Sequence, residues 1–227
     1  MNKKRLLTVM GGSKKIPWYL AGGIPISSCI AAYQAVGRNT YAETLINLVN
    51  SSIHILTDTG RTPDWNTTDG WIGASGDALT TDIKPYKNYT LAIRYKDVVD
   101  TDANESFSKI GVFNKYYFGL DHSGTDATAL RFANGLDASK YRDIAPNSLE
   151  YGTAILAGRS CYVDGVYKNI IADSTWNSDG LQPSIRILNR DDYTAPLGGK
   201  ILAWAIYNET LDAPTIAQLH TAMMALP

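Results

Sequence analysis

A chain of 227 residues is long enough for one domain with a core of its own, and its 44% share of hydrophobic residues is typical of a globular protein. The formal net charge of -1 gives no electrostatic reason to expect binding to nucleic acid or to an anionic membrane. No apolar run approaches the roughly 20 residues that cross a bilayer, so no membrane span is predicted.

The chain begins with a basic segment similar to the start of a secretory leader, although its apolar run is short and is broken by Gly11 and Gly12. We therefore expect residues 1–25 to be retained as a basic arm and connector that anchors the protein in an assembly and is mobile when the protein is alone. Trp18 and Tyr19 indicate a segment that docks, either on the chain's own domain or on a neighbouring subunit. The predicted arm residues are Lys3, Lys4, Arg5, Lys14, Lys15, Trp18 and Tyr19.

Short runs rich in β-branched and aromatic residues fill most of the chain, and turns separate them at short intervals. Asn134-Gly135 and Asp164-Gly165 are typical hairpin turns. Because these runs do not alternate with helices, the pattern indicates two antiparallel sheets packed face to face and excludes a parallel α/β sheet. We expect a short helix at 41–49, a loop at 62–70, and strands at 29–34, 71–73, 78–82, 89–96, 109–113, 116–120, 129–134, 153–157, 161–163, 168–172, 184–189 and 199–208.

The last quarter of the chain predicts a strand, a turn and a closing helix. Ile201, Ala203, Ala205 and Tyr207 alternate along residues 199–208 with Leu202, Trp204 and Ile206, so both faces of this strand are apolar and expected to be covered. Asp212 then stands where a helix N-cap belongs, with Pro214 in the first turn. Apolar residues then follow at spacings of three and four, which places them on one face of a helix and predicts that this helix covers a sheet: Ile216, Leu219, Met223 and Leu226.

Several of these segments together resemble a known superfamily. Cys-Tyr-Val-Asp-Gly-Val-Tyr at 161–167, Ile-Arg-Ile-Leu-Asn-Arg at 185–190 and the strand that begins at residue 199 look like the laminin-G-type jelly rolls of the concanavalin A-like superfamily. Segments 29–34, 69–72 and 79–85 resemble a subgroup found in phage and metagenomic proteins, and the resemblance covers residues 29–226. It implies an all-β, antiparallel two-sheet jelly-roll sandwich at 26–227, with a C-terminal helix and an extended N-terminal arm.

The resemblance also implies a function, although members of this superfamily have several. The phage-like segments imply a non-enzymatic protein of a virion surface, a capsid decoration or fibre domain, whose arm contacts other virion proteins or further copies of the chain. The alternative is a carbohydrate-binding lectin or adhesin module of a cellular protein, located outside the cell and contacting cell-surface glycans.

The carboxylates and histidines do not predict an enzyme. Glycoside hydrolysis usually needs two carboxylates across the scissile bond, and hydrolases with this fold carry them on a strand of the type Glu-x-Asp-x-x-Glu. None of the four glutamates stands in such a pattern. Asp121, His122 and Ser123 are adjacent, but neighbouring side chains on a strand point to opposite faces. No catalytic residue is therefore predicted.

Exposed aromatic rings flanked by amides and carboxylates are the usual basis of sugar binding, and two expected loops have this composition. We predict ligand contacts at Trp65, Trp176, Asn177, Asp179, Asp191, Asp192 and Tyr193. For each aromatic residue, ordinary packing remains the alternative interpretation.

One acidic loop has the chemistry of a calcium site. Asp97, Asp100 and Asp102 offer the carboxylate oxygens that hard cations prefer, although acidic loops between strands are often only solvated. No other cofactor is predicted. Cys29 and Cys161 lie in expected strands, either as two buried thiols or as a disulfide pair.

Overall fold

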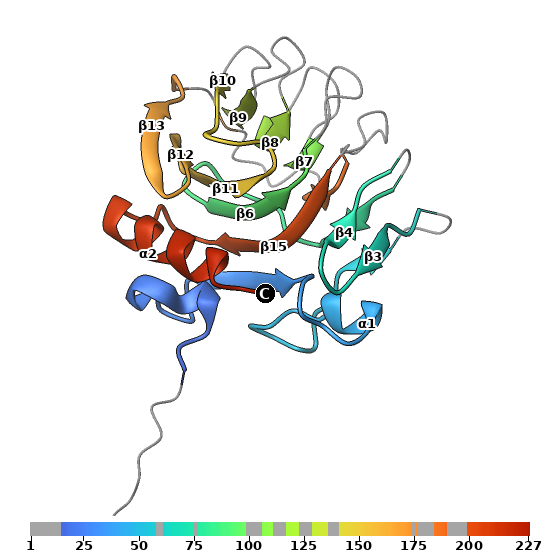
Figure 1. The fold of residues 1–227 in the computed structure, drawn as a ribbon. Coiled ribbons are helices and arrows are strands. Elements are labelled where there is room, and N and C mark those ends of the chain that lie inside the picture. The colour runs from blue at the N-terminus through green and yellow to red at the C-terminus, as the bar shows by residue number, and fades with distance from the viewer. Residues whose placement is uncertain are drawn as a thin grey trace, which may run out of the picture.

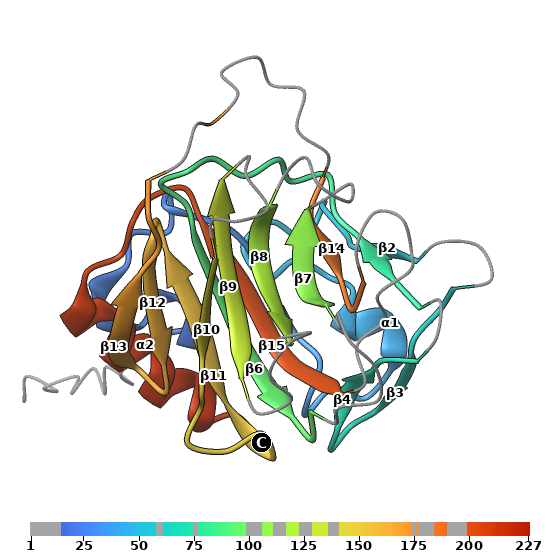
Figure 2. The same ribbon diagram turned by 90° about the horizontal axis from the view of Figure 1, so that it is seen from above.

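The computed structural model describes residues 15–57, 61–74, 77–98, 106–110, 117–122, 129–135, 141–173, 176, 184–189 and 199–227. The described strands form two antiparallel sheets packed face to face, and a C-terminal helix covers the outer face of the larger sheet (Figure 1). The predicted all-β sandwich with a closing helix is therefore confirmed. Seen from above, the smaller sheet lies in front of the larger one (Figure 2).

The larger sheet contains eight of the described strands, in the order β13-β12-β11-β6-β15-β4-β3, with β1 also paired to β15. Strand β15 lies at its centre because it pairs with β6 along one side and with both β1 and β4 along the other. The strands are β1 (Cys29–Gln34), β3 (Asp64–Asn66), β4 (Gly70–Ile72), β6 (Thr90–Lys96), β11 (Tyr151–Ala157), β12 (Ser160–Val163), β13 (Val166–Ile170) and β15 (Lys200–Tyr207).

The smaller sheet contains seven of the described strands, in the order β10-β9-β8-β7-β14-β5-β2. Strands β8 and β9 pair over their whole length, from Tyr117 opposite Gly135 to His122 opposite Leu130. The strands are β2 (Leu56–Thr57), β5 (Leu79–Thr80), β7 (Ser106–Ile110), β8 (Tyr117–His122), β9 (Leu130–Gly135), β10 (Tyr141–Ile144) and β14 (Arg186–Ile187).

Strand β15 is covered on both faces, as its sequence predicts. Trp204 and Ile206 face the core between the two sheets, while Ala203, Ala205 and Tyr207 face a second core on the outer side. Ile201 was expected on the face of Ala203, and this expectation is wrong. The register of β15 against β6 shifts between Ile201 and Ala203, so Ile201 joins Trp204 in the core between the sheets.

The second core lies beneath helix α2 (Ala213–Met224), which buries Ile216, Leu219 and Met223 against the larger sheet. Alanines at 92, 203 and 205 belong to the sheet side of this core, and such small side chains leave room for a helix to approach. The predicted N-cap is confirmed because the Asp212 carboxylate accepts a hydrogen bond of 2.9 Å from the Thr215 amide. The helix therefore forms the third layer of the fold (Figure 1).

The short helix η1 (Trp18–Gly23) extends the same core. Trp18 is 9% exposed and Tyr19 is 8% exposed, and both belong to the cluster beneath α2. The Tyr207 hydroxyl donates to the Tyr19 carbonyl over 3.1 Å, and the Tyr19 hydroxyl donates to the Leu48 carbonyl over 3.0 Å. These two aromatic residues dock on the chain's own domain, which is one of the two alternatives that the sequence leaves open.

Helix α1 (Tyr41–Thr44) is shorter than the helix expected at 41–49. Leu45 ends it, and Asn47 instead bonds to β1, accepting from the Ala32 amide and donating to the Ile30 carbonyl. An amide side chain that bonds to a neighbouring strand replaces the next turn of helix. Strand β3 also lies inside the loop expected at 62–70.

The two cysteines lie on opposite faces of the larger sheet. Both thiols are free and buried, Cys29 in the core beneath α2 and Cys161 in the core between the sheets. Burial raises the pKa of each to about 12, so neither is a reactive thiolate.

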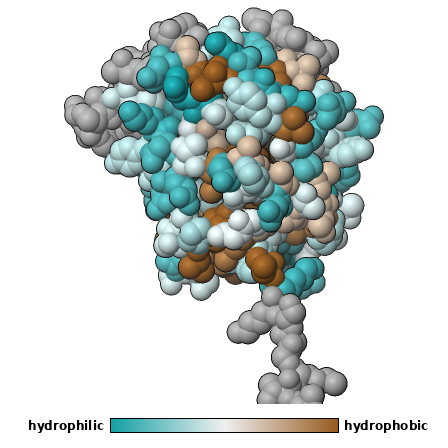
Figure 3. Space-filling view, turned by 90° about the vertical axis from the view of Figure 1, so that its left-hand side faces the viewer, coloured by the Kyte–Doolittle hydropathy of each residue, from teal (hydrophilic) through white to brown (hydrophobic). Residues whose placement is uncertain are grey.

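Figure 3 views the side of the molecule on which β13 and α2 lie. Its apolar residues appear as separate spots among polar ones rather than as one continuous patch. Within the described part of the chain, no helix has the length and apolarity needed to span a membrane.

Candidate functional site

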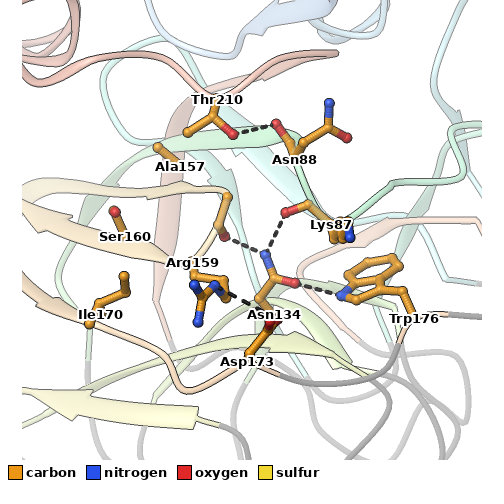
Figure 4. A pocket seen from close by; sticks show the side chains of 11 residues that line it. Lys87, Asn88, Asn134, Ala157, Arg159, Ser160, Ile170, Asp173, Trp176 and Thr210 are labelled. Atoms are coloured by element: carbon orange, nitrogen blue, oxygen red, sulfur yellow. Dashed lines mark hydrogen bonds and ion pairs between the residues drawn. The ribbon is translucent and has the colours of Figure 1, made fainter.

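A pocket of about 370 Å³ opens where loops from several distant parts of the chain meet (Figure 4). The turn between β11 and β12 and the end of β9 form part of it. The segments before β6, after β13 and before α2 complete its lining. The lining residues are Lys87, Asn88, Asn134, Ala157, Gly158, Arg159, Ser160, Ile170, Asp173, Trp176 and Thr210.

Trp176 and Asn134 form the structural centre of the pocket. The half-buried Trp176 ring meets Phe118 edge-on, with the ring centroids 6.0 Å apart. Its indole N–H donates to Asn134 Oδ1 over 2.8 Å. Asn134 is 1% exposed, and its Nδ2 donates to the Lys87 carbonyl over 3.0 Å and to the Gly158 carbonyl. One amide therefore fixes the tryptophan and two segments of backbone.

The turn between β11 and β12 consists of Gly158 and Arg159. Gly158 has a φ of +54°, and a Cβ at this position would lie 2.9 Å from Thr210 Oγ1. Glycine is required here because the backbone is left-handed and the neighbouring segment approaches closely. Thr210 in turn donates to the Asn88 carbonyl over 2.9 Å, which connects the segment before α2 to the segment before β6.

The charged side chains of the pocket lie at its rim. Arg159 Nη1 donates to the Ile171 carbonyl over 3.2 Å, and its Nε lies 3.9 Å from Asp173 Oδ1. The Asp173 side chain is 81% exposed. Lys87 is exposed as well. The site thus combines one aromatic ring with amide, hydroxyl, guanidinium, ammonium and carboxylate groups.

Two tryptophans were predicted to contact a ligand, and the structure places them differently. Trp176 lines the pocket. Trp65 lies on β3, packs against the core between the sheets and donates its indole N–H to the Ala35 carbonyl over 2.6 Å. Its ring lies 6.4 Å from that of Tyr41 and does not line this pocket. The other predicted contacts lie outside the described residues: Asn177, Asp179, Asp191, Asp192 and Tyr193.

Of the predicted arm, Lys3, Lys4, Arg5 and Lys14 lie outside the described residues. Lys15 is exposed and lines a second pocket of about 390 Å³, together with Trp18 and the end of α2. Trp18 and Tyr19 are the aromatic residues of η1 described above. The described part of this segment therefore contacts its own domain.

Of the three predicted calcium ligands, Asp97 is among the described residues, whereas Asp100 and Asp102 lie outside them. Asp97 Oδ2 lies 2.7 Å from Lys200 Nζ, so an ammonium group already neutralises its charge. Lys200 also lies 3.4 Å from Asp69, whose Oδ1 contacts Lys96 Nζ at 2.6 Å. Among the described residues, no group of three or more His, Cys, Asp or Glu side chains could hold a metal ion.

A threonine, a histidine and an aspartate also come together beneath α2. Thr153 Oγ1 lies 2.8 Å from His220 Nδ1, and the Thr153 amide donates to Asp164 Oδ1 over 3.0 Å. Thr153 belongs to β11 and is fully buried, so its hydroxyl is not accessible to a substrate. Burial lowers the pKa of His220, which favours the neutral ring. This group fastens α2 to the sheet.

Sequence reasoning missed most of the residues that surround Trp176. Asn134 was expected to begin a hairpin turn, but β9 continues through Gly135 and places the Asn134 side chain in the pocket. Lys87 and Arg159 lie 72 residues apart in the sequence, with no shared motif. The Gly158-Arg159 pair between two predicted strands was the one available signal for a tight turn at this place.

Comparison with known proteins identifies the fold. No family model and no curated protein sequence matches the chain. Among solved structures, a Trypanosoma rangeli sialidase matches with a TM-score of 0.61 and 13% identity, over 97% of this chain and 36% of that one. A botulinum neurotoxin type C matches with a TM-score of 0.58 and 12% identity, over 87% of this chain and 52% of that one. The binding domain of botulinum neurotoxin serotype D matches with a TM-score of 0.60 and 12% identity, over 88% of this chain and 53% of that one.

This chain thus spans between about a third and about half the length of the structures that it matches. At 12–13% identity, these likenesses show the fold alone. They agree with the antiparallel two-sheet β-sandwich that the described strands form.

Proposed function

We propose that this domain is a non-catalytic carbohydrate-binding module whose site is the pocket around Trp176. The observation that carries the proposal is the fixed tryptophan. Its ring is held by Phe118 and by Asn134 at the wall of a pocket rich in hydrogen-bonding groups. A sugar ring has an apolar C–H face and a polar rim, and a held aromatic ring with nearby amide, hydroxyl and charged groups matches both.

The size of the pocket supports a small ligand. A volume of about 370 Å³ lies at the lower end of the range of about 300–1,000 Å³ typical of small-molecule sites. One or two sugar units fit such a volume. The walls come from turns and loops supported by the sheets, and loops on a rigid scaffold are where binding residues concentrate.

The structural neighbours support the same class of ligand. Botulinum neurotoxin type C depends on interaction with two ganglioside molecules to enter cells, and a Trypanosoma rangeli sialidase is seen in complex with sialic acid. Both proteins engage a glycan and share this β-sandwich at low identity. The step from their ligands to a glycan ligand for this chain is part of our proposal.

Binding without turnover is also part of the proposal. Glycoside hydrolysis generally uses two carboxyl groups, one on each side of the scissile bond. Among the described residues that line the pocket, Asp173 supplies the single carboxylate, and it lies beside Arg159. A lining with one carboxylate among its described residues lacks the pair that this mechanism generally uses.

A single shallow sugar site often gives only millimolar affinity, near -4 kcal/mol, and many linked copies raise the effective affinity. The sequence resemblance supplies a setting with many copies, the surface of a virion, to which the basic residues of the predicted arm that precede η1 would anchor the domain. An extracellular adhesin is the other setting. Both locations, the arm's contacts with other virion proteins and self-association remain predictions from the sequence.

The experiment is a glycan-array screen of the purified chain, followed by calorimetric titration of the best ligand into variants. Trp176→Ala should weaken binding about tenfold or more, since loss of a packed ring costs on the order of 1.4 kcal/mol or more. Trp176→Phe keeps a ring and should stay within about threefold of the parent. Tyr86→Ala removes an exposed aromatic ring outside the pocket and should change nothing.

Each variant's thermal unfolding is measured first, so that loss of fold and loss of ligand contact are separated. The proposal is wrong if folded Trp176→Ala binds as tightly as the parent protein. It is also wrong if no glycan binds, or if a bound glycan is cleaved during the titration.

A further inference from the structure

Two cationic side chains line the pocket from opposite sides of Asn134, as Figure 4 shows. Arg159 comes from the turn between β11 and β12, and Lys87 comes from the segment before β6. The Asn134 side chain links the two segments, because its Nδ2 bonds to the carbonyls of Lys87 and Gly158. The backbone positions of both cations are therefore fixed by the same amide.

The guanidinium of Arg159 is oriented before any ligand arrives. Its Nη1 bond to the Ile171 carbonyl holds one end of the group. Its contact with Asp173 is long, at 3.9 Å, and the Asp173 side chain is 81% exposed. An exposed pair at this distance contributes little and is readily exchanged for a better-placed anion. A planar guanidinium with several N–H groups suits a carboxylate in particular.

Lys87 adds a second positive charge. Its side chain is exposed, and its ammonium makes no ion pair with the residues that the structure describes. The described lining residues thus contribute two cations and one carboxylate, and the Asp173 side chain is more exposed than that of Arg159. A concave site with excess positive charge attracts anions.

We propose that the ligand of this pocket is an acidic sugar, whose ring packs on Trp176 while its carboxylate binds Arg159 and Lys87. This inference rests on the proposed function and specifies the class of glycan. Uronic acids and sialic acids carry the required carboxylate on a sugar ring. With a neutral sugar bound, Lys87 would have no counter-charge among the described residues, and Arg159 would keep only its long contact with Asp173.

The test compares matched acidic and neutral ligands by calorimetric titration. One pair is the trimer of galacturonate and its carboxyl-reduced form, and the other is sialyllactose and lactose. The acidic member of at least one pair should bind about tenfold tighter at about 50 mM salt, and the advantage should shrink at about 500 mM. The pair that shows the advantage identifies the source of the carboxylate.

Variants then locate the charge effect. Lys87→Gln and Arg159→Gln should each weaken the acidic ligand about three- to tenfold and weaken the neutral ligand by a clearly smaller factor. Lys84→Gln removes an exposed charge three residues from Lys87, outside the pocket lining, and should have no effect. Lys87→Gln is the decisive variant because its ammonium makes no described contact that folding needs.

The outcomes separate this inference from the function on which it rests. If neutral and acidic members bind equally, or if the acidic preference survives both substitutions, the inference is overturned while carbohydrate binding stands. If no glycan of any kind binds on the array, the proposed function fails and this inference fails with it.

Discussion

Asn134→Ala tests the framework that holds the pocket together. The Asn134 side chain is nearly fully buried at 1% exposure and connects β9 to Trp176, to the segment before β6 and to the turn after β11. Alanine removes every one of these bonds without adding volume. The indole N–H and the carbonyls of Lys87 and Gly158 then lose this partner.

The expected cost follows from the three groups left behind. A buried polar group without its hydrogen bond costs about 1–3 kcal/mol. Because these groups border a pocket that water can enter, the lower value applies to each, which gives a total of about 3 kcal/mol. For a chain of this length, about 3 kcal/mol corresponds to a fall in Tm of about 6–12 °C.

Differential scanning calorimetry of the two proteins measures this fall. Asn88→Ala is the matched control, because the exposed Asn88 amide makes a single long and therefore weak hydrogen bond, 3.5 Å to the Asn208 carbonyl. The Tm of this variant should differ from that of the parent by less than about 2 °C. Trp176→Phe removes a single N–H from the same network and should cost about 1 kcal/mol. The reasoning is refuted if Asn134→Ala unfolds within about 2 °C of the parent, like the control.

Two further predictions concern stability. Leu219→Ala removes a fully buried side chain from the inner face of α2 and should lower the free energy of unfolding in urea by about 2–5 kcal/mol, whereas Gln218→Ala on the exposed face should change it by less than about 0.5 kcal/mol. Equal effects of the two would contradict the described packing of the helix. The Lys96 ammonium lowers the pKa of Asp69 from 3.8 to about 2, so the carboxylate contributes stability that is present above 3.8 and is lost as pH falls to about 2. Because solvent screens this partly exposed pair, Asp69→Asn should lower the free energy of unfolding at neutral pH by about 1 kcal/mol. The variant should also lose less stability than the parent between pH 3.8 and about 2. If stability falls equally in both proteins over this pH range, the proposed role of Asp69 is wrong.

The end of the chain could be predicted from sequence because its signals are local and agree with one another. Asp212, Pro214 and an apolar stripe mark the start and the buried face of α2, and all lie within one helix. Strand β1 matches its expected range at residues 29–34 for the same reason. Where several local signals within a few positions favour the same element, the long-range contacts of the fold favour it too, and the prediction is correct.

The predictions of secondary structure are wrong where contact with a distant segment determines the local conformation. Ile201 changes face because the register of β15 against β6 shifts beside it. The helix expected at 41–49 stops at Thr44 because Asn47 bonds to β1, which is 13 residues upstream at its nearest end. Strand β3 forms because β4 is available to pair with it. None of these partners can be read from the local pattern.

The candidate site could be predicted only in part for a related reason. The sequence singles out Trp176 because it is an aromatic residue flanked by amide and carboxylate side chains in an expected loop. Asn134, Lys87 and Arg159 reach it through three separate segments of the fold. Asn134 in particular was interpreted as a turn residue, since Asn-Gly is a hairpin signal, whereas the structure uses it as a buried amide.

A nuclear magnetic resonance titration of the tryptophan indole N–H signals tests carbohydrate binding at this pocket most directly. The Trp176 signal is assigned by its absence from the Trp176→Phe spectrum, and the best glycan from the array is then added stepwise. The proposed site predicts a saturable shift of the Trp176 signal, while the signals of fully buried Trp71 and Trp204 stay in place. A glycan that binds and leaves the Trp176 signal unmoved would contradict it.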